Sequence, residues 1–273
     1  MRKNFMRERK VPCGEMYKAV MIYPYSEEQE QALKRPRGCR SKPTTPKQAQ
    51  LNKNHAERYF VAKAHENFSP GDKKFEGTYD KAHLPRTLEE AERNLTNFID
   101  RLNYECKKQG FPPVVYMATL EGGDGQIRIH HHMILKCKLS RDEIENIWRV
   151  RRNPGAKKDE VIGDANCQPL RFDYYSTGIK KLCLYMLKKT RGRYNYRCSK
   201  GMRKPQLNNP KRKNDSRYSF REIRKLAKSP PDVSYWEKQY KGYTIADMEN
   251  DVEFRYNSET DRWSVYLFLR RIE

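Results

Sequence analysis

The sequence lacks any apolar run approaching the roughly 20 residues that a membrane-spanning helix needs. Its charged opening, MRKNFMRERK, has no apolar core behind it, so we expect no secretory signal. It also lacks a GxxxxGK[ST] phosphate loop, so any unwinding of nucleic acid would have to come from a partner. We therefore expect a protein with no membrane association and no helicase activity of its own.

Paired cysteines are missing as well. The chain has seven cysteines, and no two of them stand as CxxC. An odd number without paired spacing argues against a disulfide framework and against a structural zinc site. A reducing, cytoplasmic location fits this cysteine usage best.

Positive charge, in contrast, is abundant. The chain has 57 lysines and arginines against 35 acidic residues, a formal net charge of +22. A field of this sign and size favours a polyphosphate partner, and binding to it would weaken steeply with salt. The composition therefore predicts a nucleic-acid-binding protein.

The pattern of apolar and turn-forming residues predicts an α+β fold, with antiparallel hairpins between helices and no regular βαβ units. We expect a basic, mobile N-terminal arm over 1–43, a main domain over 44–205, and a basic linker with a C-terminal helix and hairpin over 206–273. The expected helices cover 46–67, 88–106, 141–148, 177–189 and 220–228. The expected strands cover 74–79, 114–121, 127–137, 168–172, 252–256 and 263–269.

Three consecutive histidines lie in the second strand of the central hairpin. Side chains alternate between the faces of a strand, so His130 and His132 share one face and His131 points to the more apolar side. Two imidazoles at this spacing can reach one divalent ion. The alternative is a surface histidine cluster that binds no metal.

A carboxylate would complete such a site for phosphate chemistry. Glu121 ends the partner strand just across the hairpin and is our candidate for the third ligand. Asp124, in the hairpin loop, is the rival candidate. A glutamate at a strand end is often merely solvated, and that reading of Glu121 stays open.

A basic segment with interleaved tyrosines follows. Between Ser176 and Lys204 there are ten basic residues and no acidic one. Cations for the phosphate backbone and rings for base stacking suit single-stranded nucleic acid; a solvated basic face is the alternative. The candidate DNA-binding residues are Lys181, Lys189, Arg191, Arg193, Arg197, Lys200, Arg203 and Lys204.

Tyr185 is the candidate nucleophile in this segment. At about 100° per residue it falls beside the apolar stripe of its helix, and Lys188 and Lys189 follow it at three and four residues. Nearby ammonium groups would favour the phenolate and stabilise charge on a phosphate. The alternative is a tyrosine that packs its ring at the edge of the core.

With these motifs the chain resembles the HUH endonucleases, specifically the rolling-circle replication initiator (Rep) proteins of plasmids and bacteriophages, including the filamentous-phage gene II type. The resemblance covers roughly residues 41–205. It rests on three motifs in the order IHHHMIL, LYMLK and CSKGMRKP, and more weakly on Ser41-Lys42-Pro43.

The resemblance implies a central five-stranded antiparallel sheet with flanking helices. It implies that His130, His132 and Glu121 hold Mg²⁺ or Mn²⁺, with Tyr185 as nucleophile and Lys188 as its lysine partner. The implied reaction nicks single-stranded or hairpin origin DNA, leaving a 5′-phosphotyrosine and a free 3′-OH for rolling-circle replication. The implied partners are a host helicase and DNA polymerase in the bacterial cytoplasm.

Some residues depart from the family's pattern. The middle of the histidine motif is His131 rather than an aliphatic residue, and the early strand carries Glu76 and Gly77 where small or apolar residues are usual. Only one tyrosine is well placed, since Tyr174 and Tyr175 precede the helix. Alternatives are an HUH transposase or relaxase, a non-catalytic single-stranded nucleic-acid-binding or replication-control protein, and an RNA-binding protein.

Overall fold

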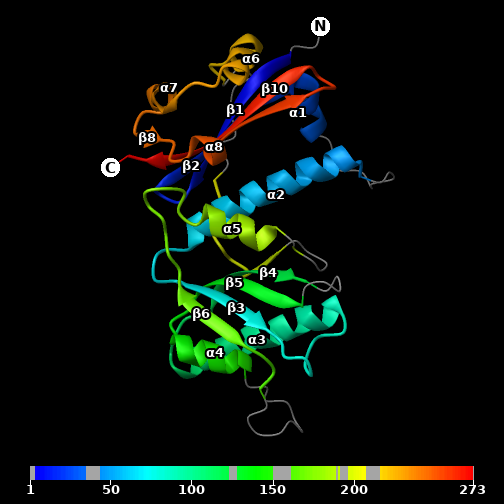
Figure 1. Cartoon of the computed structure of the whole chain (residues 1–273), viewed down its shortest axis with the longest axis vertical. Coiled ribbons are helices and arrows are strands. Elements are labelled where there is room, and N and C mark those ends of the chain that lie inside the picture. Colours follow the sequence, from blue (N-terminus) through cyan, green and yellow to red (C-terminus); the bar gives the residue numbers. More distant parts are fainter. Residues whose placement is uncertain are drawn as a thin grey trace. The chain divides into compact units, whose positions relative to one another are not determined.

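The computed structural model describes residues 4–34, 44–122, 128–149, 161–188, 190, 196–206 and 216–272. The chain forms two compact units, each described by itself below (Figure 1). The first contains Met1–Glu66, Asp173–Gly178 and Lys204–Glu273, and the second contains Asn67–Phe172 and Ile179–Arg203. Among the described helices, none combines the length and the apolar character that crossing a membrane requires.

A five-stranded antiparallel sheet forms the centre of the second unit. Its strand order is β6-β3-β5-β4-β7, and each neighbouring pair is antiparallel. The strands are β3 (Lys73–Thr78), β4 (Val115–Glu121), β5 (His130–Lys136), β6 (Ala165–Pro169) and β7 (Arg197–Cys198). The predicted α+β class and the predicted five-stranded antiparallel sheet are therefore confirmed.

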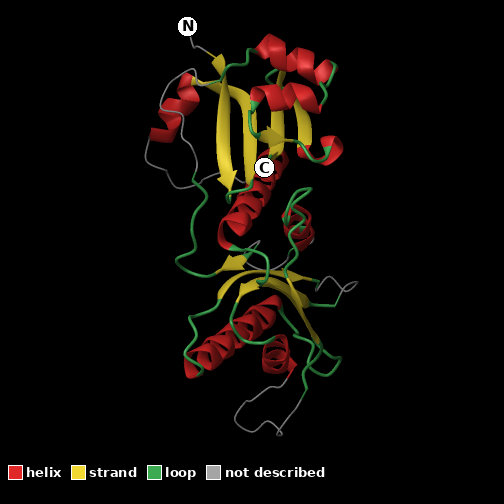
Figure 2. Cartoon of the chain, turned by 90° about the vertical axis from the view of Figure 1, so that its left-hand side faces the viewer, coloured by secondary structure: helices red, strands yellow, loops and turns green. Residues whose placement is uncertain are grey.

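Two helices, α3 (Leu88–Lys108) and α4 (Arg141–Arg149), cover one face of this sheet (Figure 2). Thr87 caps α3 by accepting a hydrogen bond from the Glu90 amide, an interaction favoured at the N-terminus of a helix. The apolar side chains recur at helical spacing and are buried against the sheet. The core includes Phe75, Leu95, Phe98, Leu102, Met133, Leu135, Ile144 and Trp148.

Gly77 lies in β3 at a point where the α4 side of the sheet leaves no room for a side chain. A Cβ on Gly77 would lie 2.7 Å from Cε2 of Trp148 and 2.9 Å from Cε1 of Phe75. The indole of Trp148 also donates a hydrogen bond to the Thr78 carbonyl at 2.9 Å. Gly77, an unusual residue for a strand interior, is thus the position that lets Trp148 pack flat on β3.

The opposite face of the sheet carries α5 (Lys180–Leu187), which is shorter than the predicted helix over 177–189. The structure corrects the N-terminal boundary for a physical reason. Gly178 has φ of +61°, outside the helical region, and its amide bonds to the Asp173 carbonyl in a turn that belongs to the first unit. The helix can begin only after that turn.

The first unit contains a second sheet, which joins the two ends of the described chain. Its order is β1-β2-β10-β8, with β9 also paired to β10. The strands are β1 (Asn4–Cys13), β2 (Tyr17–Ser26), β8 (Tyr243–Thr244), β9 (Val252–Asn257) and β10 (Arg262–Arg271). Its helices are α1 (Glu27–Lys34), α2 (Pro46–Asn67), α6 (Phe220–Lys228), α7 (Val233–Gln239) and α8 (Met248–Asp251).

The prediction of a mobile arm over 1–43 is therefore wrong for residues 4–26. A proline such as Pro24 argues against a strand, because it cannot donate to a sheet ladder. Pro24 pairs with Met6 of β1, whereas β10 pairs only with Tyr17–Ile22 of β2, so Pro24 lies in the part of β2 that has one neighbour. The basic segment 35–43 and the predicted linker over 208–213 lie outside the described residues.

The strand predicted over 168–172 begins earlier, at Ala165. Ala165 and Cys167 are buried at a spacing of two residues and pair with Gly77 and Phe75 of β3. The buried Leu170 lies beyond the strand end, where its amide donates to the Asp72 carbonyl. Leu170 is buried although it does not pair in a strand, which explains why the predicted strand lies too far along the chain.

Candidate metal and tyrosine site

The histidine strand β5 lies between β3 and β4, and the register brings carboxylates to both of its sides. His132 pairs with Glu76 on β3 and with Thr119 on β4. His130 pairs with Thr78 and with Glu121. Strand alternation therefore places two imidazoles and two carboxylates on the face that carries α5.

His131 points to the opposite face, as predicted. It is fully buried, and its Nε2 is 2.8 Å from the Tyr79 hydroxyl. Burial, together with the neighbouring His130, His132 and Arg197, lowers the pKa of His131 to about 3. This neutral histidine packs edge-on against Trp148 and belongs to the core side of the strand.

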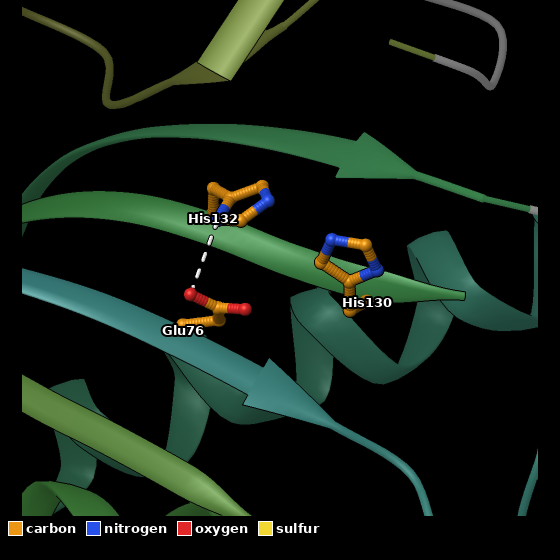
Figure 3. A group of neighbouring side chains, drawn as sticks. All are labelled: Glu76, His130 and His132. Atoms are coloured by element: carbon orange, nitrogen blue, oxygen red, sulfur yellow. Dashed lines mark ion pairs between the residues drawn. The ribbon is translucent and has the colours of Figure 1, made fainter. Parts of the chain in front are cut away.

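Glu76, His130 and His132 form a group that can hold a metal ion, with one ligand atom from each lying within 4.8 Å of the others (Figure 3). The ring of His130 is oriented by a hydrogen bond of 2.8 Å from its Nδ1 to the Arg128 carbonyl. A carbonyl can only accept, so Nδ1 carries the proton and the lone pair of Nε2 is available to a metal.

In His132 the nitrogen available to a metal is Nδ1. Its Nδ1 is buried without a hydrogen-bond partner and lies 3.7 Å from Oε2 of Glu76. Burial, as the largest cause, lowers the pKa of His132 despite Glu76 and Glu121, so the imidazole is neutral. A buried, neutral and unpartnered nitrogen facing a carboxylate fits a metal ligand.

Glu121 also lies at this site. Its Oε2 is 3.5 Å from Nε2 of His130 and 3.3 Å from Nε2 of His132. Its role as third ligand stays a prediction, and Glu76 is a second carboxylate that the sequence reading missed. Glu76 is placed at the site by the register of β3 against β5, and this register cannot be read from residue types alone. Asp124 lies outside the described residues.

Tyr185, on α5, lies at the same site. Its ring centroid is 5.3 Å from that of His132, in an edge-to-face arrangement, and the side chain is 50% exposed. Burial, then Glu76 and then Glu121, raises the pKa of Tyr185. The expectation that neighbouring lysines would favour the phenolate is not met among the described residues, since the causes of this shift are burial and two carboxylates; Lys189 lies outside them.

The predicted DNA-binding residues divide into three sets. Lys181, Lys200, Arg203 and Lys204 are exposed, whereas Lys189, Arg191 and Arg193 lie outside the described residues. Arg197 differs from both sets. Its guanidinium donates to the Glu92 carbonyl at 3.0 Å and to the Thr96 hydroxyl at 2.8 Å, both on α3, so it lies on the helix-covered face.

One protein family matches the chain at this site. Residues 77–191 match the model of a family described as replication-associated protein, of the ORF2 and gene II protein type. The match contains His130, His132, Glu121 and Tyr185, and it begins directly after Glu76. No curated protein and no solved structure is significantly similar to the chain. This match over residues 77–191 supports the assignment of the chain to a family of rolling-circle replication initiators.

Proposed function

We propose that this replication-associated protein nicks single-stranded DNA at a replication origin, using Tyr185 as nucleophile beside a divalent metal held by the histidine strand. The observation that carries the proposal is the edge-to-face contact of Tyr185 with His132, at 5.3 Å between ring centroids. A half-exposed phenol beside a candidate metal group is accessible to a DNA strand.

The proposed reaction is a transesterification. The phenol oxygen of Tyr185 forms a bond to the scissile phosphorus, and the bond from phosphorus to the 3′ oxygen breaks. The phenol gives up a proton and the departing 3′ oxygen takes one up, so the number of phosphate esters is unchanged. The products are a 5′-phosphotyrosine and a free 3′-OH, which can prime DNA synthesis by a host polymerase after a helicase opens the duplex.

The side chains around Tyr185 have separate roles in this proposal. His130 and His132 supply neutral nitrogen ligands, and Glu76 and Glu121 supply carboxylates on either side of them. Lys188, at the end of α5, is proposed to contact the phosphate that Tyr185 attacks. A bound divalent cation would supply Lewis-acid polarisation of that phosphate, and the carboxylate donors suit Mg²⁺ or Mn²⁺.

A cleavage assay on labelled single-stranded and hairpin oligonucleotides from the origin tests the proposal. Reactions with Mn²⁺ are separated on a denaturing protein gel, where a covalent protein–DNA band is expected for the native chain. The band should disappear with EDTA and with Tyr185→Phe, which removes the nucleophilic oxygen but keeps the ring.

Tyr175→Phe is the matched control, because Tyr175 is an exposed tyrosine outside the site. This control should leave the band intact. A band that persists in Tyr185→Phe would move the nucleophile to another tyrosine. Tight binding of DNA with no band on any substrate would favour a non-catalytic replication-control protein.

A further inference from the structure

Helix α6 of the first unit carries a basic stripe that lies outside the family match at residues 77–191. Arg221, Arg224, Lys225 and Lys228 are all exposed. They stand at positions i, i+3, i+4 and i+7, the spacing of one face of an α-helix. We call these four residues the α6 stripe.

The packing of α6 leaves the α6 stripe exposed to solvent. The opposite side of the helix packs into the core of the first unit through the buried Ile223 and the partly buried Phe220 and Leu226. Ser219 caps the helix in a reciprocal capping box with Glu222, whose carboxylate accepts from the Ser219 amide at 2.6 Å. Glu222, the acidic residue within α6, is thus engaged in capping, and the cations are presented on a fixed helix.

The neighbouring β9–β10 hairpin adds to this surface. The guanidinium of Arg262 lies over the Phe220 ring, 4.4 Å from its centroid. Tyr256 is 50% exposed. Its hydrogen bond to Asp261 raises the pKa of Tyr256, and the nearby Arg224 acts in the opposite direction. The surface is strongly cationic, with one exposed aromatic side chain at its edge.

We propose that the α6 stripe binds the phosphate backbone of double-stranded DNA. From Arg221 to Lys228 the helix rises about 10 Å, so the four cations lie within a short stretch of one helix face. The two strands of a DNA duplex together present a phosphate at about every 1.7 Å along the axis, so several phosphates lie within reach of such a stretch. An α-helix is also narrow enough to enter the major groove of DNA.

The composition of the stripe also favours a duplex over a single strand. Proteins that bind single strands place several aromatic rings along a basic groove, because base stacking supplies much of the affinity. The α6 stripe has four cations and no ring, with only Tyr256 near it. A duplex offers phosphates but no free base faces, which is what this surface can bind.

The proposed contact adds to the nicking activity and does not depend on it, because it uses no residue of the metal and tyrosine site. The test removes all four stripe charges in the full chain, with Arg221→Gln, Arg224→Gln, Lys225→Gln and Lys228→Gln. Binding to a labelled duplex and to a labelled single strand is then measured by fluorescence anisotropy across a series of salt concentrations.

For the duplex we expect the slope of log affinity against log salt to become shallower by about 3 to 4, since each lost phosphate contact contributes about 0.9. The slope for the single strand should change by less than about 1. A matched variant removes the same charge from exposed positions of the second unit, with Lys81→Gln, Arg93→Gln, Lys107→Gln and Lys138→Gln. It should leave the duplex slope close to that of the native chain.

A duplex slope equal in the stripe variant and the matched variant would overturn the proposal. Equal losses for duplex and single strand would also overturn it, in favour of an unselective basic surface. If the stripe variant unfolds at a lower temperature, Arg221→Lys with Arg224→Lys, which keeps the charge, provides a second comparison and should keep the native slope. The covalent Tyr185 band on single-stranded DNA reports separately on the nicking proposal.

Discussion

At the scale of single residues, the side chains of the candidate site come from three neighbouring strands rather than from one motif. His130 and His132 come from β5, Glu76 from β3 and Glu121 from β4. The two carboxylates approach different nitrogens of His132, since Glu76 faces Nδ1 and Glu121 faces Nε2. Metal affinity can therefore be used to separate the contribution of each carboxylate.

We predict that Glu76→Gln weakens Mn²⁺ binding about 10- to 100-fold, because the substitution removes the carboxylate that faces the unpartnered nitrogen of His132. Glu121→Gln, measured beside it by isothermal titration calorimetry, shows whether the second carboxylate is a further ligand. Glu89→Gln, an exposed position on α3, is the control and should bind as the native chain does. Unchanged affinity in Glu76→Gln would exclude this residue from the metal group.

A second prediction at this scale concerns Gly77. Gly77→Ala should lower the free energy of unfolding by about 1–3 kcal/mol, because the added methyl group overlaps Trp148 and Phe75. Urea denaturation measures the loss. In a double-mutant cycle, the loss of unfolding free energy caused by Gly77→Ala should be smaller when Trp148→Phe is also present. Strictly additive effects would mean that the methyl group and the indole do not meet.

At the scale of elements, a buried carboxylate fastens α4 to the edge strand β6. Glu145 accepts a hydrogen bond from the Cys167 amide at 2.8 Å and pairs with Arg141 and Arg149. Burial acts against the charge of Glu145, but the bonds from Cys167 and Arg141 prevail and hold its pKa below the usual 4.5. The carboxylate is thus ionised in the native state and bound at the helix–strand junction.

We predict that Glu145→Ala lowers the free energy of unfolding at neutral pH by about 1–3 kcal/mol, since it leaves the buried Cys167 amide without an acceptor. Glu145→Gln, which keeps an acceptor, should cost less. The lowered native pKa adds stability that is fully present well above pH 4.5 and is lost as the pH falls below 4.5 and through the lower native pKa. In urea denaturation at several pH values, the free energy of unfolding of both variants should fall less steeply toward acid pH than that of the native chain. An equal dependence on pH in the variants and the native chain would contradict this role of Glu145.

The elements show which parts of the fold could be read from the sequence. Helix α6 spans Phe220–Lys228, the range expected from the sequence, and the central hairpin β4–β5 follows from strand alternation. The hairpin β1–β2 could not be read in this way. Its apolar face, with Val20 and Ile22, is completed by β10 from far along the chain, and such long-range pairing leaves no local signal.

At the scale of the whole molecule, the candidate metal group lies entirely within the second unit. A ligand stabilises the part of a protein that must remain folded in order to bind it. Metal binding should therefore act unequally on the two units if each unfolds by itself.

We predict that Mn²⁺ at about 100 times its dissociation constant adds about 2.7 kcal/mol of protection to amides of β3, β4 and β5. Amides of β2 and β10 should gain much less. Native-state hydrogen exchange measures both sets, and His130→Ala with His132→Ala should abolish the gain. Equal protection of both sheets would show that the two units unfold as one.

The order of the two units along the chain has a consequence for synthesis on the ribosome. The sheet of the second unit is complete once residue 198 has emerged, whereas the first unit requires β10, which ends at Arg271. At elongation rates of about 5 to 20 residues per second, Val20 and Ile22 of β2 then stay uncovered for on the order of ten seconds. A chain that stops before β10 would leave the apolar face of the β1–β2 hairpin exposed after the sheet of the second unit is complete, so we expect chaperones to bind at this hairpin.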